Sequence, residues 1–366
     1  MSAAQVTARA PGKLFVAGEY AVVTPGEPAV LIAVDRYLTA HLTESADAGS
    51  IHSPEYGHVP LRWTRSENGL AIDREHHPYD YVLATIRVAE RLRAELGLAP
   101  RLFDLRLDSG LDDVSGRKFG LGSSAAVTVA TARAIDEFYG FGLDRSELFR
   151  LALLATIEVS PAASGGDVAA SVFGGWIGYS APDRAVLAAR AADGILGLVR
   201  AGGDAWQDLR IERLAPPAAL RLLVGWTGAP ASTARLVGDV RRRAGTVDHT
   251  EFVLDSRVCV DELWRALTDG DDDRVLDLLR RARRLLQRLG DEAGIRIETD
   301  ALAALCDSAE AIGAAGKPSG AGGGDCGIVL APPDADVAAM LRDWEAHDIR
   351  HLTVAVHPPE GGVHVG

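Results

Sequence analysis

The stretch Gly116–Ile135, with the sequence GRKFGLGSSAAVTVATARAI, decides how this chain folds. It follows Leu102–Ser109, an alternation of apolar and polar residues that is typical of a half-buried strand. It continues as a largely apolar run that ends at Gly140, which predicts a mostly buried helix. Between the two, Gly120 and Gly122 allow a tight turn and the close approach of a ligand to the backbone. The sequence therefore predicts a strand, a glycine-rich loop and a helix in succession.

The start of that helix is a candidate anion-binding site. Its first backbone N–H groups have no partner within the helix, and the helix dipole also favours a negative charge there. The hydroxyl groups of Ser123 and Ser124 can bind a phosphate or Mg²⁺, and Lys118 lies just upstream, within reach of the same anion. The loop matches neither GxxxxGK[ST] nor GxGxxG. The alternative interpretation is an ordinary helix capped by a serine.

Lysine is rare in this chain. Of the 38 basic residues 35 are Arg, and the three lysines all lie in or beside glycine-rich segments: Lys13, Lys118 and Lys317. A compact charge on a flexible stem differs from the planar fork of arginine, and phosphate-binding sites often need the former. We therefore expect these three positions to be functional, with chance placement as the alternative.

A second glycine-rich segment, KPSGAGGGDCGIVL, covers Lys317–Leu330 and has five glycines between Gly320 and Gly327. Each glycine costs conformational entropy when it is ordered, so such a loop is expected to serve a purpose that requires bare backbone. A flexible linker is the alternative. It is disfavoured because an apolar strand follows at once and a helix precedes.

Four charged side chains are further candidates. Lys13 in APGKLFVAGEY is expected to be functional, although a surface lysine with a buried stem is the alternative. Glu19 follows at even spacing, so it either shares one side of a strand with Lys13 or serves as a structural ion-pair partner. Asp167 in SGGDVAAS is the lone acid between Val159 and Pro182, although Gly-Asp is also a common turn. Glu158 either binds a metal or simply ends the preceding helix.

The composition is that of a folded globular protein. The chain has 366 residues, 47% hydrophobic and 24% charged, which disfavours disorder. No apolar run is long enough to span a membrane, and the N-terminus lacks the apolar region of a signal peptide. A net charge of −13 disfavours nonspecific binding to nucleic acid or anionic lipid. The basic run Arg280–Arg288 is interpreted as a salt-bridged helix face, because an acidic run precedes it.

The three cysteines are scattered without CxxC spacing, which disfavours a zinc site or a disulfide framework: Cys259, Cys306 and Cys326. They fit the reducing cytosol, so we expect a cytoplasmic protein.

Strands and helices are mixed along the chain rather than alternating regularly, which favours an α+β protein of two domains. The junction is expected between Ala181 and Pro217, where the sequence is rich in Ala, Gly and Pro. Beyond it we expect a helix over Thr299–Ala315 and a final strand over His351–Pro358.

Three motifs, in this order, resemble the signature motifs of the GHMP kinases: APGKLFVAGEYAVV, GLGSSAAVTVA and KPSGAGGGDCGIVL. The resemblance runs from about residue 8 to about residue 330. It implies an N-terminal ATP-binding domain, residues 1–190, and a ferredoxin-like C-terminal domain, residues 215–366. ATP, Mg²⁺ and a small-molecule acceptor would bind between them.

The resemblance also implies roles for individual residues. Asp167 matches the catalytic aspartate and Lys13 its lysine partner, while Ser124 and Glu158 would hold Mg²⁺. The spacing from Glu158 to Asp167 departs from the pattern of relatives, as does the lead-in PAASGGD. The residues expected around the ATP phosphates are Lys118, Gly120, Leu121, Gly122, Ser123, Ser124 and Ala125. Those expected around the acceptor are Lys317, Ser319, Gly320, Ala321 and Gly322.

Within the family, the segments SGGDVAASVFGGWIGY and VGWTGAPAST are most similar to members that phosphorylate 5-phosphomevalonate. The resemblance therefore implies phosphoryl transfer from ATP to this acceptor, in the mevalonate pathway to isoprenoids. Phosphorylation of mevalonate or of another small molecule is the alternative, and a non-catalytic sensor is a third. Small-molecule substrates are the only partners expected, with no nucleic acid and no membrane, in a monomer or a homodimer.

Overall fold

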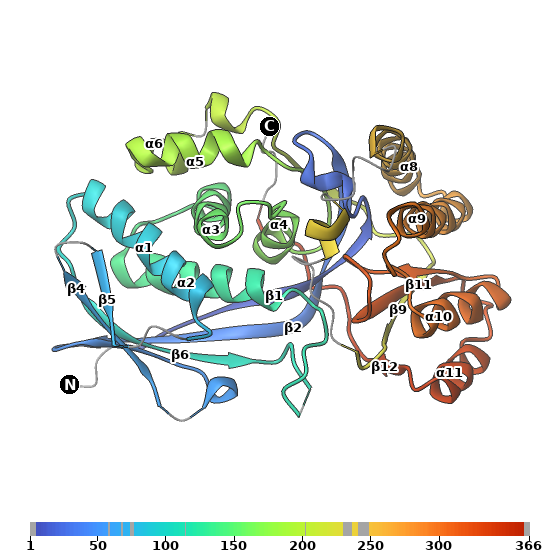
Figure 1. Ribbon diagram of the computed structural model, residues 1–366, viewed down its shortest axis with the longest axis horizontal. Helices are drawn as coiled ribbons and strands as arrows, with labels where there is room; N and C mark the ends of the chain where they lie inside the picture. Colours follow the sequence, from blue (N-terminus) through green and yellow to red (C-terminus); the bar gives the residue numbers. More distant parts are fainter. Residues whose placement is uncertain are drawn as a thin grey trace.

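The computed structural model describes residues 5–57, 59–66, 69–73, 77–113, 115–201, 203–229, 236–240 and 249–361. Two separate β-sheets organise the chain, and each carries its own helices (Figure 1). The larger sheet is built from residues 6–214 and the smaller one from residues 221–352.

The larger sheet has the strand order β5-β4-β3-β6-β2-β7-β8, with β1 paired to β2. Only β3 and β6 run parallel; the other pairs are antiparallel. The long β2 pairs with β1 along one edge and with β7 and then β6 along the other, so it is the backbone of this sheet. The strands are β1 (Val6–Ala17), β2 (Pro28–Ser45), β3 (Gly49–His52), β4 (Leu61–Ser66), β5 (Gly69–Ile72), β6 (Leu102–Ser109), β7 (Trp176–Ser180) and β8 (Arg210–Leu214).

Helices cover one face of this sheet (Figure 1). They are α1 (Asp80–Glu95), α2 (Ser123–Tyr139), α3 (Arg145–Val159), α4 (Gly166–Phe173), α5 (Arg184–Asp193) and α6 (Leu196–Arg200), with short 3-10 turns η1 (Ala21–Val23), η2 (Pro54–Tyr56) and η3 (Asp204–Trp206). Asp144 caps α3 through a reciprocal pair of hydrogen bonds with Glu147, as their spacing indicates. The strand–loop–helix succession predicted around the first glycine-rich loop is confirmed as β6 followed by α2.

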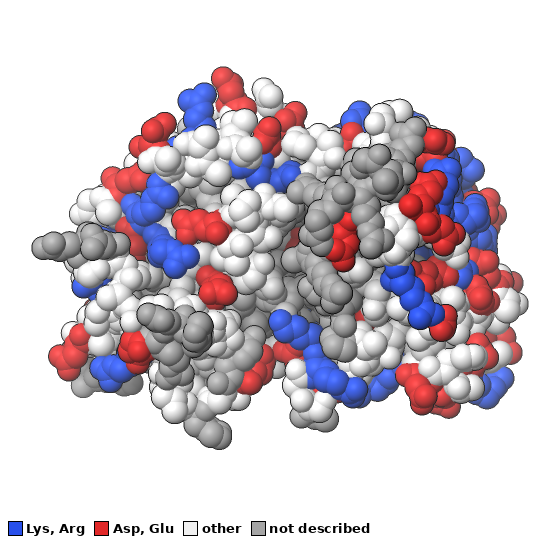
Figure 2. All heavy atoms as spheres, viewed as in Figure 1, with Lys and Arg blue, Asp and Glu red and all other residues white. Residues whose placement is uncertain are grey.

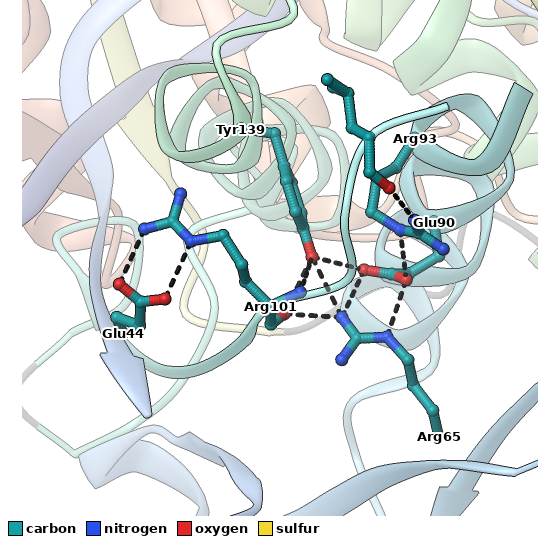
Figure 3. Close-up of polar contacts among 7 residues, drawn as sticks. Glu44, Arg65, Glu90, Arg93, Arg101 and Tyr139 are labelled. Carbon is teal, nitrogen blue, oxygen red and sulfur yellow. Dashed lines mark hydrogen bonds and ion pairs between the residues drawn. The ribbon is translucent and has the colours of Figure 1, made fainter. Parts of the chain in front are cut away.

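A polar network ties α1 and α2 to the sheet at one end of the molecule (Figure 3). Arg65 of β4 makes two hydrogen bonds of 2.8 and 2.7 Å to the carboxylate of Glu90 on α1. The hydroxyl of Tyr139, at the end of α2, donates to Glu90 at 2.8 Å. Arg101 then pairs with Glu44 of β2 through two bonds of 2.8 Å. The network crosses four elements and satisfies charges that are half removed from water.

The smaller sheet has the antiparallel order β10-β11-β9-β12. Its strands are β9 (Arg221–Trp226), β10 (Ala315–Pro318), β11 (Cys326–Ala331) and β12 (Arg350–Leu352). Helices α8 (His249–Asp269), α9 (Asp272–Ala293) and α10 (Asp300–Ala311) lie between β9 and β10 in the chain, and α11 (Val337–Ala346) lies between β11 and β12. This connectivity and strand order are those of a ferredoxin-like fold.

Three expectations about element bounds are corrected. The helix expected over Thr299–Ala315 ends at Ala311, because Ala315 pairs with Leu330 as the first residue of β10. The final strand pairs with β9 only over Arg350–Leu352. The larger sheet extends past residue 190, because β8 pairs with β7.

The rest of that final strand returns to the larger sheet, and we call Thr353–Gly361 the returning segment. Its Val356 forms a β-bridge with Val34 of β2, and the N–H of His357 donates to Ala33. Near its end, the N–H of Glu360 donates to the carbonyl of Phe173, the last residue of α4. The chain therefore passes between the two sheets twice.

Charges of both signs are interspersed over the face shown in Figure 2. The basic run on α9 illustrates the pattern, because Arg280 pairs with Asp277, Arg288 with Asp255, and Arg283 with three acidic residues. The prediction of a salt-bridged helix face is confirmed. Among the described residues, no helix combines the length and the apolar character needed to cross a membrane.

Candidate active site

A cavity of about 650 Å³ lies where the two units meet, and it collects side chains from both glycine-rich segments. Its wall includes the basic residues Lys13 and Lys118, the acidic residues Glu19, Asp167 and Asp325, and the hydroxyl-bearing residues Tyr20, Tyr81, Ser123, Ser124, Thr156, Ser160 and Ser164. Gly120, Gly122, Ala125, Gly320 and Ala321 supply backbone and small side chains. Most of the predicted site residues thus share one cavity.

Lys13 lies on β1, opposite Ala33 of β2, directly after a register shift at Pro11 and Gly12. Its N–H donates to the carbonyl of Leu121 at 2.8 Å, which fastens β1 to the first glycine-rich loop. Its side chain is buried, and Nζ lies 3.3 Å from Oδ2 of Asp167. The resemblance implied this partnership, and the structure brings the two predicted catalytic residues together.

Asp167 is the second residue of α4, within its first turn. Its carboxylate therefore lies at the positive end of the helix dipole and beside the ammonium group of Lys13. The residue before the helix, Gly165, has a φ of +86°, and a Cβ there would lie 2.6 Å from the side chain of Leu153. The lead-in PAASGGD, which departs from the pattern of relatives, thus forms a tight glycine turn before α4. Asp167 still lies at the cavity.

The first loop ends in a helix start without a side-chain cap. The residue preceding α2 is Gly122, in the left-handed conformation, so the cap position has no side chain to bond to the first amides. The alternative of a serine-capped helix therefore does not hold. A Cβ on Gly122 would lie 2.7 Å from Cε of Lys13, so glycine is required for the loop to pack against that lysine. Ser123, Ser124 and Ala125 follow on the cavity wall, whereas the side chain of Leu121 is in the core.

The second loop lies against β1 and the turn that follows it. Gly320 and Ala321 line the cavity. Ser319 does not; its hydroxyl accepts from the N–H of Phe15 at 2.8 Å and donates to the carbonyl of the same residue at 3.0 Å. Gly322 packs against the carbonyl of Ile297, with no room for a Cβ. Ser319 and Gly322, predicted to bind the acceptor, instead hold the shape of the loop.

The sequence places Lys317 among the acceptor-binding residues, but its ammonium group is fully enclosed. Nζ donates to Oε1 of Glu19 and to the carbonyl of Pro318. Lys317 is not among the residues that line the cavity. Its spacing had left two roles open for Glu19, and the structure shows that it is an ion-pair partner, of Lys317 rather than of Lys13.

Glu158, predicted as a Mg²⁺ ligand, forms an ion pair of 3.2 Å with Arg87 and is not part of the cavity wall. Thr156, two positions earlier in the same helix, and Ser160, just past the end of the helix, do line the cavity. Residues two positions apart lie on opposite sides of an α-helix, so Glu158 lies on the side of α3 opposite Thr156. The described residues hold no cluster of three or more His, Cys, Asp or Glu side chains suited to a metal ion.

Of the cavity residues that the sequence analysis missed, three stand out. Tyr81, in the first turn of α1, carried no motif; burial raises its pKa, although hydrogen bonding to Ser124 opposes this. Tyr20 donates to the carbonyl of Ala321 at 2.6 Å, and burial beside Glu19 raises its pKa. Asp325 has a φ of +52°, unusual for a residue with a side chain. For Asp325, the sequence signal that could have found it was an acidic residue directly after a run of glycines.

These features define a kinase class, and the chain belongs to the GHMP kinases. Residues 80–175 match the family description "GHMP kinases N terminal domain", and residues 265–349 match "GHMP kinases C terminal". The first match contains both the uncapped α2 start and Asp167, and the second contains the second glycine-rich loop. The family and the two-domain α+β fold expected from the three motifs are confirmed.

Among its relatives, the chain is 45% identical to the phosphomevalonate kinase of Streptomyces sp. (strain CL190), over 95% of this chain and 96% of the relative. It is 29% identical to the mevalonate kinase of Pyrococcus horikoshii, over 92% of each chain. Its fold matches Streptococcus pneumoniae phosphomevalonate kinase in complex with phosphomevalonate and AMPPNP, with a TM-score of 0.83 at 27% identity. That match covers 96% of this chain and 99% of the other.

Proposed function

We propose that this chain transfers the γ-phosphoryl group of ATP to the phosphate of 5-phosphomevalonate, giving ADP and 5-diphosphomevalonate. The observation that carries the proposal is the ion pair of Lys13 and Asp167 in a cavity walled by both glycine-rich loops, in a chain 45% identical to a phosphomevalonate kinase. A phosphate oxygen of the acceptor attacks the γ-phosphorus, and the bond to the β-phosphate oxygen breaks.

Phosphoryl transfer depends mainly on positioning and on the neutralisation of developing charge. The uncapped amides at the start of α2 suit the phosphates of ATP, with Ser123, Ser124 and Lys118 beside them. Lys13 lies between this loop and Gly320, so its ammonium group is placed to meet the moving phosphoryl group. Gly320 and Ala321 line the wall that we assign to the acceptor.

Mg²⁺ fits this donor set as a companion of ATP. In kinases it keeps several waters and binds through phosphates and one or two protein oxygens, so a dedicated cage of protein ligands is unnecessary. The hydroxyl of Ser124 and the carboxylate of Asp167 are the candidate ligands on the cavity wall. When bound, Mg²⁺ would neutralise charge on the ATP phosphates.

The acceptor needs little help from a base. The second pKa of a phosphate monoester is about 6, so the acceptor is largely a dianion at neutral pH. Asp167 therefore acts chiefly by orienting Lys13 and the acceptor. An alcohol acceptor, such as mevalonate, would instead require the removal of a proton.

The test is ADP release with 5-phosphomevalonate and with mevalonate, each with and without Mg²⁺. Turnover with the phosphorylated acceptor alone, and only with Mg²⁺, is the expected result. Turnover with mevalonate alone would assign an alcohol kinase and make Asp167 a general base. Turnover with neither acceptor would overturn the proposal and direct the search to other small acceptors of the family.

We also propose a cytoplasmic location. The three cysteines are free and buried, which suits a reducing compartment. The assembly state remains a prediction of a monomer or a homodimer, which sedimentation of the purified protein would measure.

A further inference from the structure

We infer that Lys317 is a positioning residue: by fixing the carboxylate of Glu19, it holds Gly320 and Ala321 at the acceptor wall of the cavity. The inference rests on the proposed function for its kinetic readout and on the structure alone for its geometry. Lys317 lies on β10 and Glu19 in the turn after β1, so the pair joins the two units.

The pair is removed from water. Lys317 is 0% exposed, and the side chain of Glu19 is 3% exposed. Removing both charges from water costs a large desolvation free energy. Two apolar side chains of similar volume could connect the same two segments. A role beyond cohesion is therefore needed to account for charge at this place.

The hydrogen bonds at Oε1 of Glu19 indicate what this role is. This oxygen accepts from Nζ of Lys317 and also from the N–H of Gly320, at 3.3 Å. An apolar pair would leave the Gly320 amide without this partner. With Lys317 in place, the carboxylate has a charged partner that orients it, and it fixes the loop backbone at one point.

Neighbouring bonds fix the loop on either side of that point. Ser319 is bonded to Phe15 of β1, and the carbonyl of Ala321 accepts from Tyr20. Three consecutive loop residues are thus tethered to Phe15, Glu19 and Tyr20. A Cβ on Gly320 would lie 3.9 Å from Nζ of Lys13, so the tethered backbone is adjacent to the catalytic lysine.

The choice of lysine fits this geometry. Arginine supplies 35 of the 38 basic residues, yet lysine stands where the charged group is fully enclosed. A single ammonium group can meet one carboxylate oxygen and one carbonyl, whereas a planar fork needs more room and more acceptors. Lys317→Arg is therefore not a conservative change here.

The test compares Lys317→Met with the wild type. We expect the KM for the acceptor to rise about tenfold and the KM for ATP to stay within about twofold, since coupled neighbours interact by such factors. Hydrogen exchange of residues 319–325 should accelerate about tenfold without any substrate present. Lys317→Arg should restore neither property.

Arg283→Met is the matched control. Arg283 is also a buried cation, 5% exposed, and it pairs with Glu298, Asp307 and Glu310, none of which lines the cavity. Its loss should lower stability and leave the acceptor KM and the exchange of residues 319–321 unchanged; Gly323 is left out of this comparison because it bonds to Ile297, the neighbour of Glu298. If Lys317→Met behaves like this control in both measurements, Lys317 is merely structural and the inference is overturned.

The double variant Glu19→Leu with Lys317→Met also removes the acceptor of the Gly320 amide, and it covers the case in which Lys317→Met does not fold. It removes both charges, so it avoids a buried carboxylate without a partner. The loop should still exchange faster than in the wild type; unchanged exchange would refute the positioning role. Hydrogen exchange needs no turnover, so it remains decisive even if 5-phosphomevalonate proves not to be the acceptor.

Discussion

The two glycine-rich loops meet at one cavity but obtain their shapes in different ways. The first, Gly120–Ser124, follows its own strand and ends in an uncapped helix, so its binding groups arise from local backbone geometry. The second, Ser319–Gly324, is shaped by hydrogen bonds to β1 and the following turn, in the other unit. A local motif therefore specifies most of the first loop, which β1 also holds through Lys13, whereas the second loop depends chiefly on residues 301 to 304 positions away.

Lys13 touches both loops, so its loss is expected to be the most damaging change. Lys13→Met should lower kcat by about 10³-fold and Asp167→Asn by about 10²-fold, the range seen when a preorganised electrostatic contact is removed. Steady-state kinetics over a range of pH measures both. If Asp167→Asn is far worse and its rate profile shifts to alkaline pH, Asp167 acts as a base and the orienting role is wrong.

Gly122→Ala should disrupt the first loop alone. Its φ of +79° is strained for alanine, and the added Cβ would displace Lys13. We expect kcat/KM to fall about 10²-fold for both substrates, because a small misplacement near the reacting atoms costs this much. Gly116→Ala is the control, since it has the same φ with nothing within 4 Å of its Cβ. Equal losses in the two variants would show that backbone strain, rather than contact with Lys13, is responsible.

Ser319→Ala should loosen the second loop alone. It removes two hydrogen bonds to Phe15 and leaves that N–H unsatisfied in the core. The free energy of unfolding should fall by about 1–3 kcal/mol, as for other buried groups that lose their partner. The KM for the acceptor should rise several-fold more than that for ATP. An equal rise in both KM values would contradict the division of the cavity between the two loops.

Glu90→Gln should leave both loops unaffected and change only stability. Burial raises the pKa of Glu90, but hydrogen bonds from Arg65 and Tyr139 outweigh it, so the pKa lies below its ordinary value of 4.5. The ionised group thus stabilises the fold above that value, and this contribution is lost as the pH falls through the lowered pKa. The variant should be about 1–2 kcal/mol less stable at pH 7. Denaturation curves should approach those of the wild type as the pH falls below 4.5 and through the lowered pKa. A changed kcat at pH 7 would show that this network influences the cavity.

The sequence predicted well those features that are set by residues close together in the chain. The strand before the first loop, the helix after it and the capping of α3 each depend on residues close together in the chain. The family motifs also predicted that Lys13 and Asp167 are partners, and Nζ of Lys13 lies 3.3 Å from Oδ2 of Asp167.

What it predicted poorly depends on packing between distant segments. Glu158 lies on the wrong side of α3, and the orientation of a helix toward a cavity is set by its neighbours. Lys317 is adjacent to a binding loop in sequence, yet β10 carries its side chain into the interior. The final strand divides between two sheets, and its apolar residues alone do not distinguish one pairing partner from the other.

The returning segment has a mechanical consequence. One connection between the two units runs from β8 to β9, and the second runs from β12 to the bridge between Val356 and Val34. Two rigid lobes joined by a single linker can rotate about any axis that passes through that linker. With two connections, a rotation that stretches neither connection must be about the axis that passes through both of them. The second crossing therefore limits how the two units can turn about each other, and a cut between Leu352 and Thr353 would remove it.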